Sequence, residues 1–230
     1  MHEINKVFFE SIPSTSTYAK DNAHILPMPT LIVANHQSAG RGRRGNSFYS
    51  PSDTGLYMTV IFDAPEDCSL ITPSAAVAVC RCLKNHCIDP KIKWVNDIFV
   101  DGHKACGILS EMVAKDDKHY VSVGIGINLT TEKFPEELPF AGSVGLDCDR
   151  IIFADEITQM LFDCIKTENE KIIEEYRELL FIIGKRIKYH KNNAEYTAVV
   201  SDINDQCNLI VTRSDGTEDI LSSGEISIKF

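Results

Sequence analysis

Between residues 91 and 129 the chain is a succession of β-forming runs separated by tight turns, and this stretch limits the possible folds more than any other. The runs are KIKW, DIFV, KACGILSEMVA and HYVSVGIGINL. Asp101–Gly102 separates the second run from the third, and KDD separates the third from the fourth. An Asp-Gly pair between β-rich runs is a strong hairpin signal. The stretch therefore predicts strands joined by hairpins.

The rest of the chain adds helices and further strands. Helix patterns cover residues 14–26, 73–86 and 154–182, the last as two helices, and strand patterns cover 30–35 and 55–62. From Gly184 onward the pattern changes to short strands with turns at Asn204–Asp205 and Asp215–Gly216. We therefore expect two domains, residues 1–183 and 184–230, of which the second is a small barrel.

The composition is that of an acidic globular protein. Hydrophobic residues make up 43% of the chain and charged residues 24%, both ordinary proportions, and the formal net charge is −10. No apolar run approaches the roughly 20 residues of a membrane span, and the first residues lack the features of a signal peptide. The eight cysteines form no CxxC pair, and a chain of this size needs no disulfides to fold. We expect a cytoplasmic protein that does not bind membranes.

One short segment, AGRGRRG at residues 39–45, concentrates positive charge in this acidic chain. It holds three of the eight arginines, Arg41, Arg43 and Arg44. Glycine lets a backbone approach a ligand closely, and arginine offers paired donors to phosphate and carboxylate groups. The segment therefore predicts a loop that binds an anion, and the alternative is a basic surface turn without a ligand.

Other anion-binding motifs fit this loop less well. Gly40, Gly42 and Gly45 satisfy GxGxxG, but that dinucleotide fingerprint needs a helix at the third glycine. Here NSFYSPSDTG follows and leads into a strand pattern, and no GxxxxGK[ST] occurs in the chain. The net charge of −10 also argues against general nucleic-acid binding, which needs a basic surface.

Two further segments carry polar groups on predicted strands. In KWVNDIFVDGHKACGIL, Asn96 and Asp97 begin one strand of a hairpin and Lys104 lies early on the next. Across the hairpin these groups can face one cleft, and the alternative for Lys104 is a solvated surface charge. GIGINL at residues 124–129 ends a strand with two glycines and Asn128. This pattern indicates either a ligand contact or a β-bulge.

Together these segments resemble the biotin–protein ligases. STSTYAK, QSAGRGRRGNSFYSP, KWVNDIFVDGHKACGIL and GIGINL occur in this order over residues 14–129, and SSGEISI at residues 222–228 is similar to the family's closing segment. The resemblance implies an α+β fold like that of class II aminoacyl-tRNA synthetases. Its first domain is a mixed, largely antiparallel sheet with helices on one side, and a small SH3-like β-barrel follows.

The resemblance also implies a two-step reaction with biotin and Mg-ATP as substrates. The biotin carboxylate attacks the α-phosphate of ATP, which gives biotinyl-5′-AMP and pyrophosphate. A lysine on the biotin carboxyl carrier protein domain of a biotin-dependent carboxylase then attacks the mixed anhydride. Some family members carry an N-terminal DNA-binding domain, but only 13 residues precede Ser14 here. We therefore expect a ligase that does not bind DNA, and a homodimer is one assembly that the resemblance allows.

The resemblance assigns roles to individual residues. Arg43, Lys104 and Asp97 are implied to be catalytic, and the metal ligands are left unassigned. The residues implied to bind biotin are Ser14, Thr15, Ser16, Gln37, Gly40, Arg41, Gly42, Arg43, Lys104, Gly107, Gly124 and Gly126. Those implied to bind ATP and the adenylate are Arg43, Arg44, Phe48, Asn96, Lys104 and Asn128.

Three positions depart from the family's usual pattern. Phe48 stands where tryptophan is common for stacking on adenine, Ser16 replaces an asparagine, and Val95 replaces a proline. Two rival functions stay open at this point. A lipoate–protein ligase shares the fold and the acyl-adenylate chemistry but normally lacks the GRGRRG loop, and a nucleic-acid-binding protein would use the basic loop alone.

Overall fold

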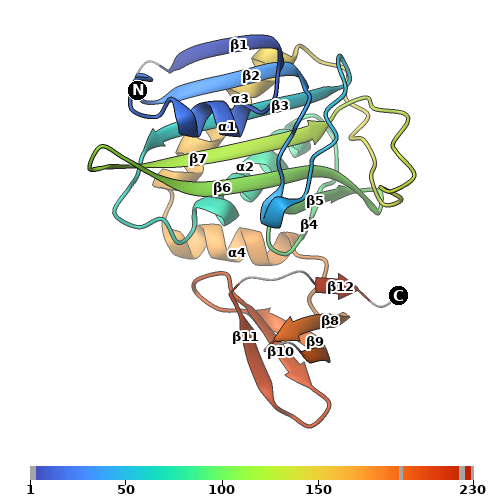
Figure 1. The fold of residues 1–230 in the computed structure, drawn as a ribbon. Coiled ribbons are helices and arrows are strands. Elements are labelled where there is room, and N and C mark those ends of the chain that lie inside the picture. The colour runs from blue at the N-terminus through green and yellow to red at the C-terminus, as the bar shows by residue number, and fades with distance from the viewer. Residues whose placement is uncertain (1–3, 192–193, 223–225, 229–230) are drawn as a thin grey trace.

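A seven-stranded mixed sheet forms the larger part of the computed structural model, which describes residues 4–191, 194–222 and 226–228 (Figure 1). Its strand order is β1-β2-β3-β7-β6-β5-β4. The strands are β1 (Asn5–Ile12), β2 (Thr30–Gln37), β3 (Gly55–Asp63), β4 (Lys91–Lys93), β5 (Asp97–Val100), β6 (His103–Lys115) and β7 (Lys118–Asn128). β1 and β2 are parallel, and the other neighbouring strands are antiparallel. The predicted mixed, largely antiparallel sheet is confirmed.

The predicted hairpins of residues 91–129 are present. Asp101 and Gly102 join β5 to β6 with φ values of 50° and 78°, and Asp116 and Asp117 join β6 to β7 with φ values of 49° and 61°. Two consecutive positive φ values match the right-handed twist of a hairpin, which is why Asp and Gly occupy such turns. The hairpins place β5, β6 and β7 side by side.

The helices cover both faces of the large sheet, so the expectation of helices on one side is wrong. They are α1 (Thr15–Asp21), α2 (Ile71–Asn85), α3 (Arg150–Lys166) and α4 (Asn169–Leu179). Leu31 and Val33 of β2 pack in one core with α2, α3 and α4, whereas Ile32 packs on the opposite face with Ala19 of α1. Because successive side chains of β2 are apolar and buried on opposite faces, each face requires a cover.

The bounds of several elements differ from the sequence patterns. α1 ends at Asp21, where the Asn22 amide caps the carbonyl of Tyr18. α3 begins at Arg150, since the Asp149 side chain accepts hydrogen bonds from the backbone N–H groups of Ile151 and Ile152. β1 was not predicted, because it is an edge strand whose side chains are at most half-buried. Within the described part of the chain, the helices are too short or too polar to cross a membrane.

A second, five-stranded antiparallel sheet lies beside α4 (Figure 1). Its strands are β8 (Arg186–Lys191), β9 (Ala194–Ile203), β10 (Leu209–Arg213), β11 (Glu218–Leu221) and β12 (Ile226–Ile228), in the order β11-β10-β9-β8-β12. Among the described residues no pairing of β11 with β12 closes this sheet into a barrel. It is consistent with an SH3-like module, and residues 223–225 of the SSGEISI segment lie outside the described residues.

Asp219 of β11 forms a buried ionic cluster in this second sheet. It accepts hydrogen bonds from Lys191, Tyr189 and Arg213. The bonds from Lys191, Tyr189 and Arg213 lower the pKa of the Asp219 carboxyl to about 2, against the opposing effect of burial. The guanidinium of Arg213 also lies over the Tyr196 ring, 3.9 Å from its centroid. The cluster therefore ties β8, β9, β10 and β11 together.

We expect Asp219→Asn to lower the free energy of unfolding at pH 7 by about 1–3 kcal/mol, because it removes the charge from these hydrogen bonds. The pKa of Asp219 is lower in the folded state, so its stabilisation is complete above about pH 4 and is lost as the pH falls toward 2. Urea titrations across this range should show the difference from wild type shrinking. Glu218→Gln, at the exposed neighbouring position, is the control. A difference that is independent of pH would contradict this account.

Candidate ligand-binding site

A cavity of about 360 Å³ opens between the large sheet, α1 and the loop over residues 36–50, which we call the glycine–arginine loop. All but three of the sequence-predicted site residues line it. The predicted residues that line it are Thr15, Ser16, Gln37, Arg41, Gly42, Arg43, Arg44, Phe48, Asn96, Asp97, Lys104, Gly107, Gly124 and Gly126. Segments far apart in the sequence thus converge on one cavity.

The cavity is strongly cationic. Five of its lining side chains are basic, and among the described lining residues Asp97 is the one carboxylate. Lys93 was not predicted, although it pairs directly with Asp97 across β4 and β5. The available signal was its place just before Asn96 and Asp97 in KWVND. Such a concentration of positive charge suits a polyanionic ligand.

A β-bulge places Lys104 in the cavity together with Gly107. Asp97 pairs with Gly107 and Phe99 pairs with Lys104, with an irregularity between Ile98 and Phe99. Residues three apart on a regular strand point to opposite faces, but the extra residue of a bulge restores them to one face. The ammonium Nζ of Lys104 lies 2.7 Å from Oδ1 of Asp97. The two predicted catalytic residues of the hairpin are therefore in direct contact.

Asn96 connects the glycine–arginine loop to the sheet. Its Oδ1 accepts a hydrogen bond from the Arg43 guanidinium at 3.1 Å, and its Nδ2 donates to the Ile108 carbonyl at 2.8 Å. Trp94 and Val95, which precede Asn96, are held by hydrogen bonds from other parts of the fold. The Trp94 indole donates to the Cys207 carbonyl in the turn between β9 and β10, and the Tyr176 hydroxyl of α4 donates to the Val95 carbonyl, both at 2.8 Å. Val95, which departs from the family's proline, is thus fixed by a neighbouring helix.

Uncharged polar side chains also lie in the cavity and at the N-terminus of α1 beside it. Ser14 caps the N-terminus of α1 by accepting a hydrogen bond from the Thr17 backbone, and its hydroxyl lies 3.4 Å from that of Ser16. The backbone N–H and the hydroxyl of Thr15 both donate to Oε1 of Gln37, at 2.9 and 3.1 Å. These groups offer donors and acceptors to a neutral polar ligand group.

Glycines form the floor of the cavity. A Cβ atom at Gly126 would lie 2.5 Å from the Phe48 ring, and one at Gly107 would lie 3.3 Å from it. At Gly124 the nearest atom would be the Ser16 hydroxyl, at 3.3 Å. The glycines therefore make room for Phe48 and Ser16 above the sheet. This is a specific steric reason for glycine on these strands.

Three predicted residues lie outside the cavity lining, namely Ser14, Gly40 and Asn128. Asn128 is 5% exposed, and its Nδ2 donates to the Gly142 carbonyl at 2.9 Å. Its predicted contact with adenine stays a prediction. Gly40 packs against the stem of the glycine–arginine loop, where a Cβ atom would lie 2.4 Å from the Phe48 carbonyl oxygen.

Comparisons with known proteins agree with this geometry. The Biotin/lipoate A/B protein ligase family matches residues 8–128, and the Biotin protein ligase C terminal domain matches residues 182–229. The Bifunctional ligase/repressor BirA of Bacillus subtilis is 38% identical over 140 residues, which cover 57% of this chain and 43% of that protein. The protein of the same name from Escherichia coli is 25% identical over 95% of this chain and 72% of its own. The matched part of the chain spans less than half of the Bacillus relatives.

Solved structures share the fold over nearly the whole chain. Biotin protein ligase from Aquifex aeolicus, in complex with biotin and ATP, superposes with a TM-score of 0.81 at 23% identity, with 98% of each chain covered. Biotin protein ligase from Leishmania major, in complex with biotinyl-5-AMP, gives a TM-score of 0.66 at 26% identity, with 95% of this chain and 99% of that chain covered. The chain belongs to the Biotin/lipoate A/B protein ligase family.

Proposed function

We propose that this chain is a biotin–protein ligase that forms biotinyl-5′-AMP from biotin and Mg-ATP and then transfers biotin to a carrier-protein lysine. The observation that carries the proposal is the cavity itself. Its lining combines the uncharged groups of Thr15 and Gln37 with five basic side chains and the Asp97 carboxylate. This combination suits a ligand with a neutral polar head and an acyl-phosphate end.

In the first step the basic residues would stabilise the charge that develops at the α-phosphate. Lys104 would contact the biotin carboxylate and the α-phosphate, and Arg43, held by Asn96, would contact the phosphates. Preorganised donors of this kind are commonly the largest catalytic term, since they need no reorganisation during the reaction. Mg²⁺ enters with ATP, and the Asp97 carboxylate would hold it together with phosphate oxygens.

In the second step the acceptor amine attacks the acyl carbon and AMP leaves. Lys104 would again neutralise the phosphate oxygen, now as part of the leaving group. Asp97 lies 2.7 Å from Lys104 and would orient the incoming amine. Thr15, Ser16 and Gln37 would hold the biotin head, and the Phe48 ring would stack on adenine with less area than the usual tryptophan. The glycine–arginine loop would keep water from the mixed anhydride.

The match to the Biotin protein ligase C terminal domain favours biotin over lipoate as the acid that is activated. The proposal is tested with purified protein, Mg-ATP, a biotin carboxyl carrier domain and either biotin or lipoate. Mass spectrometry should show the carrier gaining one biotin on its acceptor lysine and nothing in the lipoate reaction. Modification by lipoate alone would replace the proposal with its closest rival.

We expect the glycine–arginine loop to exchange its amide hydrogens faster without ligand than with biotin and ATP. Its glycines leave the backbone free, and its arginines repel one another until an anion arrives. Hydrogen-exchange mass spectrometry of residues 36–50 measures the difference, with the hairpin at residues 116–117 as an internal reference distant from the cavity. Equal protection with and without ligands would count against an ordering role.

We also propose a domain boundary near Gly184, with residues 1–183 catalytic and 184–230 accessory. The two sheets are separate, and the second family match begins at residue 182. All eight cysteines are free thiols, which agrees with a cytoplasmic site of action. The acceptor is proposed to be a carboxylase carrier domain. A homodimer stays a prediction that sedimentation can measure.

A further inference from the structure

A continuous chain of hydrogen bonds runs from the strand β3 to the glycine–arginine loop. The Thr59 hydroxyl donates to the Thr15 hydroxyl at 2.8 Å, and the Thr15 hydroxyl donates to Oε1 of Gln37 at 3.1 Å. Nε2 of Gln37 donates to the Ser50 hydroxyl at 3.0 Å. The Ser50 hydroxyl then donates to the Phe48 carbonyl at 3.0 Å. Each hydroxyl in the chain donates once in the same direction, so the orientation of every group depends on its neighbour.

The middle of this chain is buried. Thr59, Thr15 and Ser50 are 0%, 2% and 4% exposed. A buried polar group without a partner is costly. The Gln37 amide is therefore held from two sides, by Thr15 at its oxygen and by Ser50 at its nitrogen. Thr15 and Gln37 line the ligand cavity, but Ser50 does not.

Ser50 is fixed in space by the chain that follows it. The Gln37 backbone N–H donates to the Ser50 carbonyl at 3.2 Å, which closes the stem of the loop. Directly after Ser50, the Tyr57 hydroxyl donates to the Pro51 carbonyl at 2.9 Å. The Asp53 backbone N–H donates to Oδ1 of Asn35 at 3.0 Å.

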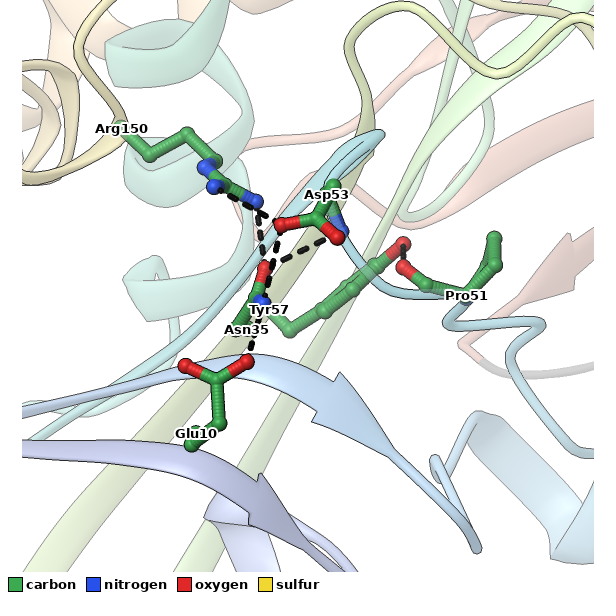
Figure 2. A network of polar contacts seen from close by, with 6 residues as sticks. All are labelled: Glu10, Asn35, Pro51, Asp53, Tyr57 and Arg150. Atoms are coloured by element: carbon green, nitrogen blue, oxygen red, sulfur yellow. Dashed lines mark hydrogen bonds and ion pairs between the residues drawn. The ribbon is translucent and has the colours of Figure 1, made fainter.

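A polar network then ties this segment to β1 and α3. Figure 2 shows Glu10, Asp53 and Arg150 converging on Asn35. Arg150 donates to Oδ1 of Asn35 at 2.5 Å, and Nδ2 of Asn35 donates to Glu10 at 2.7 Å and to Asp53 at 3.0 Å. The anchored segment begins at Pro51, so Ser50 is the point where the fixed scaffold meets the loop.

The backbone of Gly40 crosses close above these bonds. A Cβ atom there would lie 2.7 Å from the Ser50 hydroxyl and 3.1 Å from Nε2 of Gln37. The Phe48 N–H donates back to the Gly40 carbonyl at 2.9 Å. The segments on both sides of the loop stem therefore pack around the Ser50 hydroxyl.

We propose that Ser50 is a positioning residue, which couples the Gln37 amide in the cavity to the backbone of Phe48 in the glycine–arginine loop. A ligand that fixes Gln37 thereby also fixes the backbone of Phe48, and closure of the loop holds Gln37 in its binding orientation. The proposal rests on the proposed function, because biotin is taken as the ligand that contacts Gln37.

Calorimetric titration of biotin without ATP tests the coupling on the full chain. Ser50→Ala leaves Nε2 of Gln37 without its acceptor, and we expect biotin to bind about tenfold more weakly. Gln37→Ala should weaken binding to a similar or greater degree. The double variant should bind no more weakly than Gln37→Ala, because both changes break one chain. Ser38→Ala, at an exposed position of the same loop, is the matched control and should stay within twofold of wild type.

Two results would overturn the coupling. One is a Ser50→Ala protein that binds biotin within twofold of wild type, and the other is a double variant whose losses add. If Ser50→Ala unfolds, Ser50→Cys keeps the size with a weaker donor and is titrated in its place. Hydrogen exchange at Phe48 without any ligand separates this proposal from the proposed function. Faster exchange in Ser50→Ala supports the coupling even if wild type binds no biotin, and unchanged exchange contradicts it.

Discussion

Lys104→Ala should slow the formation of biotinyl-AMP by about 10²–10³-fold, the scale on which the loss of one preorganised transition-state donor acts. The ammonium of Lys104 lies 2.7 Å from Asp97 in the cationic cavity, and the side chain is 37% exposed. It is a compact charge on a flexible stem, which can follow the carboxylate oxygen as it becomes the anhydride bridge. Without Lys104 the positive charge is missing in both steps of the reaction. The fold should persist, because the residue lies in a surface cleft.

Pyrophosphate release in a single turnover, with saturating biotin and ATP, measures this effect. Lys91→Ala on β4, which β5 separates from the strand of Lys104, is the control, since Lys91 is 48% exposed and pairs with Asp89 rather than with a cavity residue. Lys104→Arg should recover only part of the rate, because a planar guanidinium cannot occupy the same point. A Lys104→Ala protein that adenylates biotin within about threefold of the wild-type rate would remove Lys104 from the catalytic residues.

The second large effect is expected for Arg43→Ala, which should weaken retention of biotinyl-AMP by about 10- to 100-fold. The Arg43 guanidinium donates to Oδ1 of Asn96 at 3.1 Å, whereas Thr15 and Gln37 are uncharged residues of the same cavity. Phosphate contacts should therefore be lost while recognition of the biotin head is largely kept. The rate at which the adenylate appears free in solution measures retention, and calorimetry measures biotin binding.

Arg186→Ala, an exposed arginine of the second sheet, controls for a general loss of positive charge. Asn96→Ala removes the partner but leaves the guanidinium, and should give a smaller loss of retention than Arg43→Ala. An Arg43→Ala protein that releases no more biotinyl-AMP than wild type would show that Arg43 is not the main phosphate contact.

The hairpins and their turns could be predicted because their signals are local. Asp101 and Gly102 adopt the backbone conformation that their residue types favour, and the runs on either side are β-forming. β1 gave no such signal, since the adjacent Phe8 and Phe9 break the alternation of apolar and polar residues, although the burial of this edge strand alternates over most of its length. The position of α1 on the second face depends on Ile32 and Ala19 packing together on that face, which is a tertiary contact.

Much of the candidate site could also be predicted, because the family resemblance rests on contiguous segments. Lys93 was missed since the two lysines of the short strand Lys91–Lys93 look like surface charges. Ser50 was missed because Gln37, 13 residues away in the sequence, becomes its neighbour only when the loop stem closes. The hydrogen bond from the Asn128 amide at the end of β7 to the Gly142 carbonyl, 14 residues further on, could not be read from the sequence, and the contact of Asn128 with adenine stays a prediction.

Because of the bulge in β6, Lys104 and Gly107 reach the same face of the strand although they are an odd number of positions apart. Two side chains reach the same face of a regular strand only at even separations, yet these two residues are three apart and both line the cavity. Ala105 and Cys106 consequently both point into the core, and both are 0% exposed. The site therefore depends on the number of residues in this strand as well as on their identity. Within this family, inserting or deleting one residue between these two positions would turn one of them from the cavity face to the core face, although every functional residue would still be present.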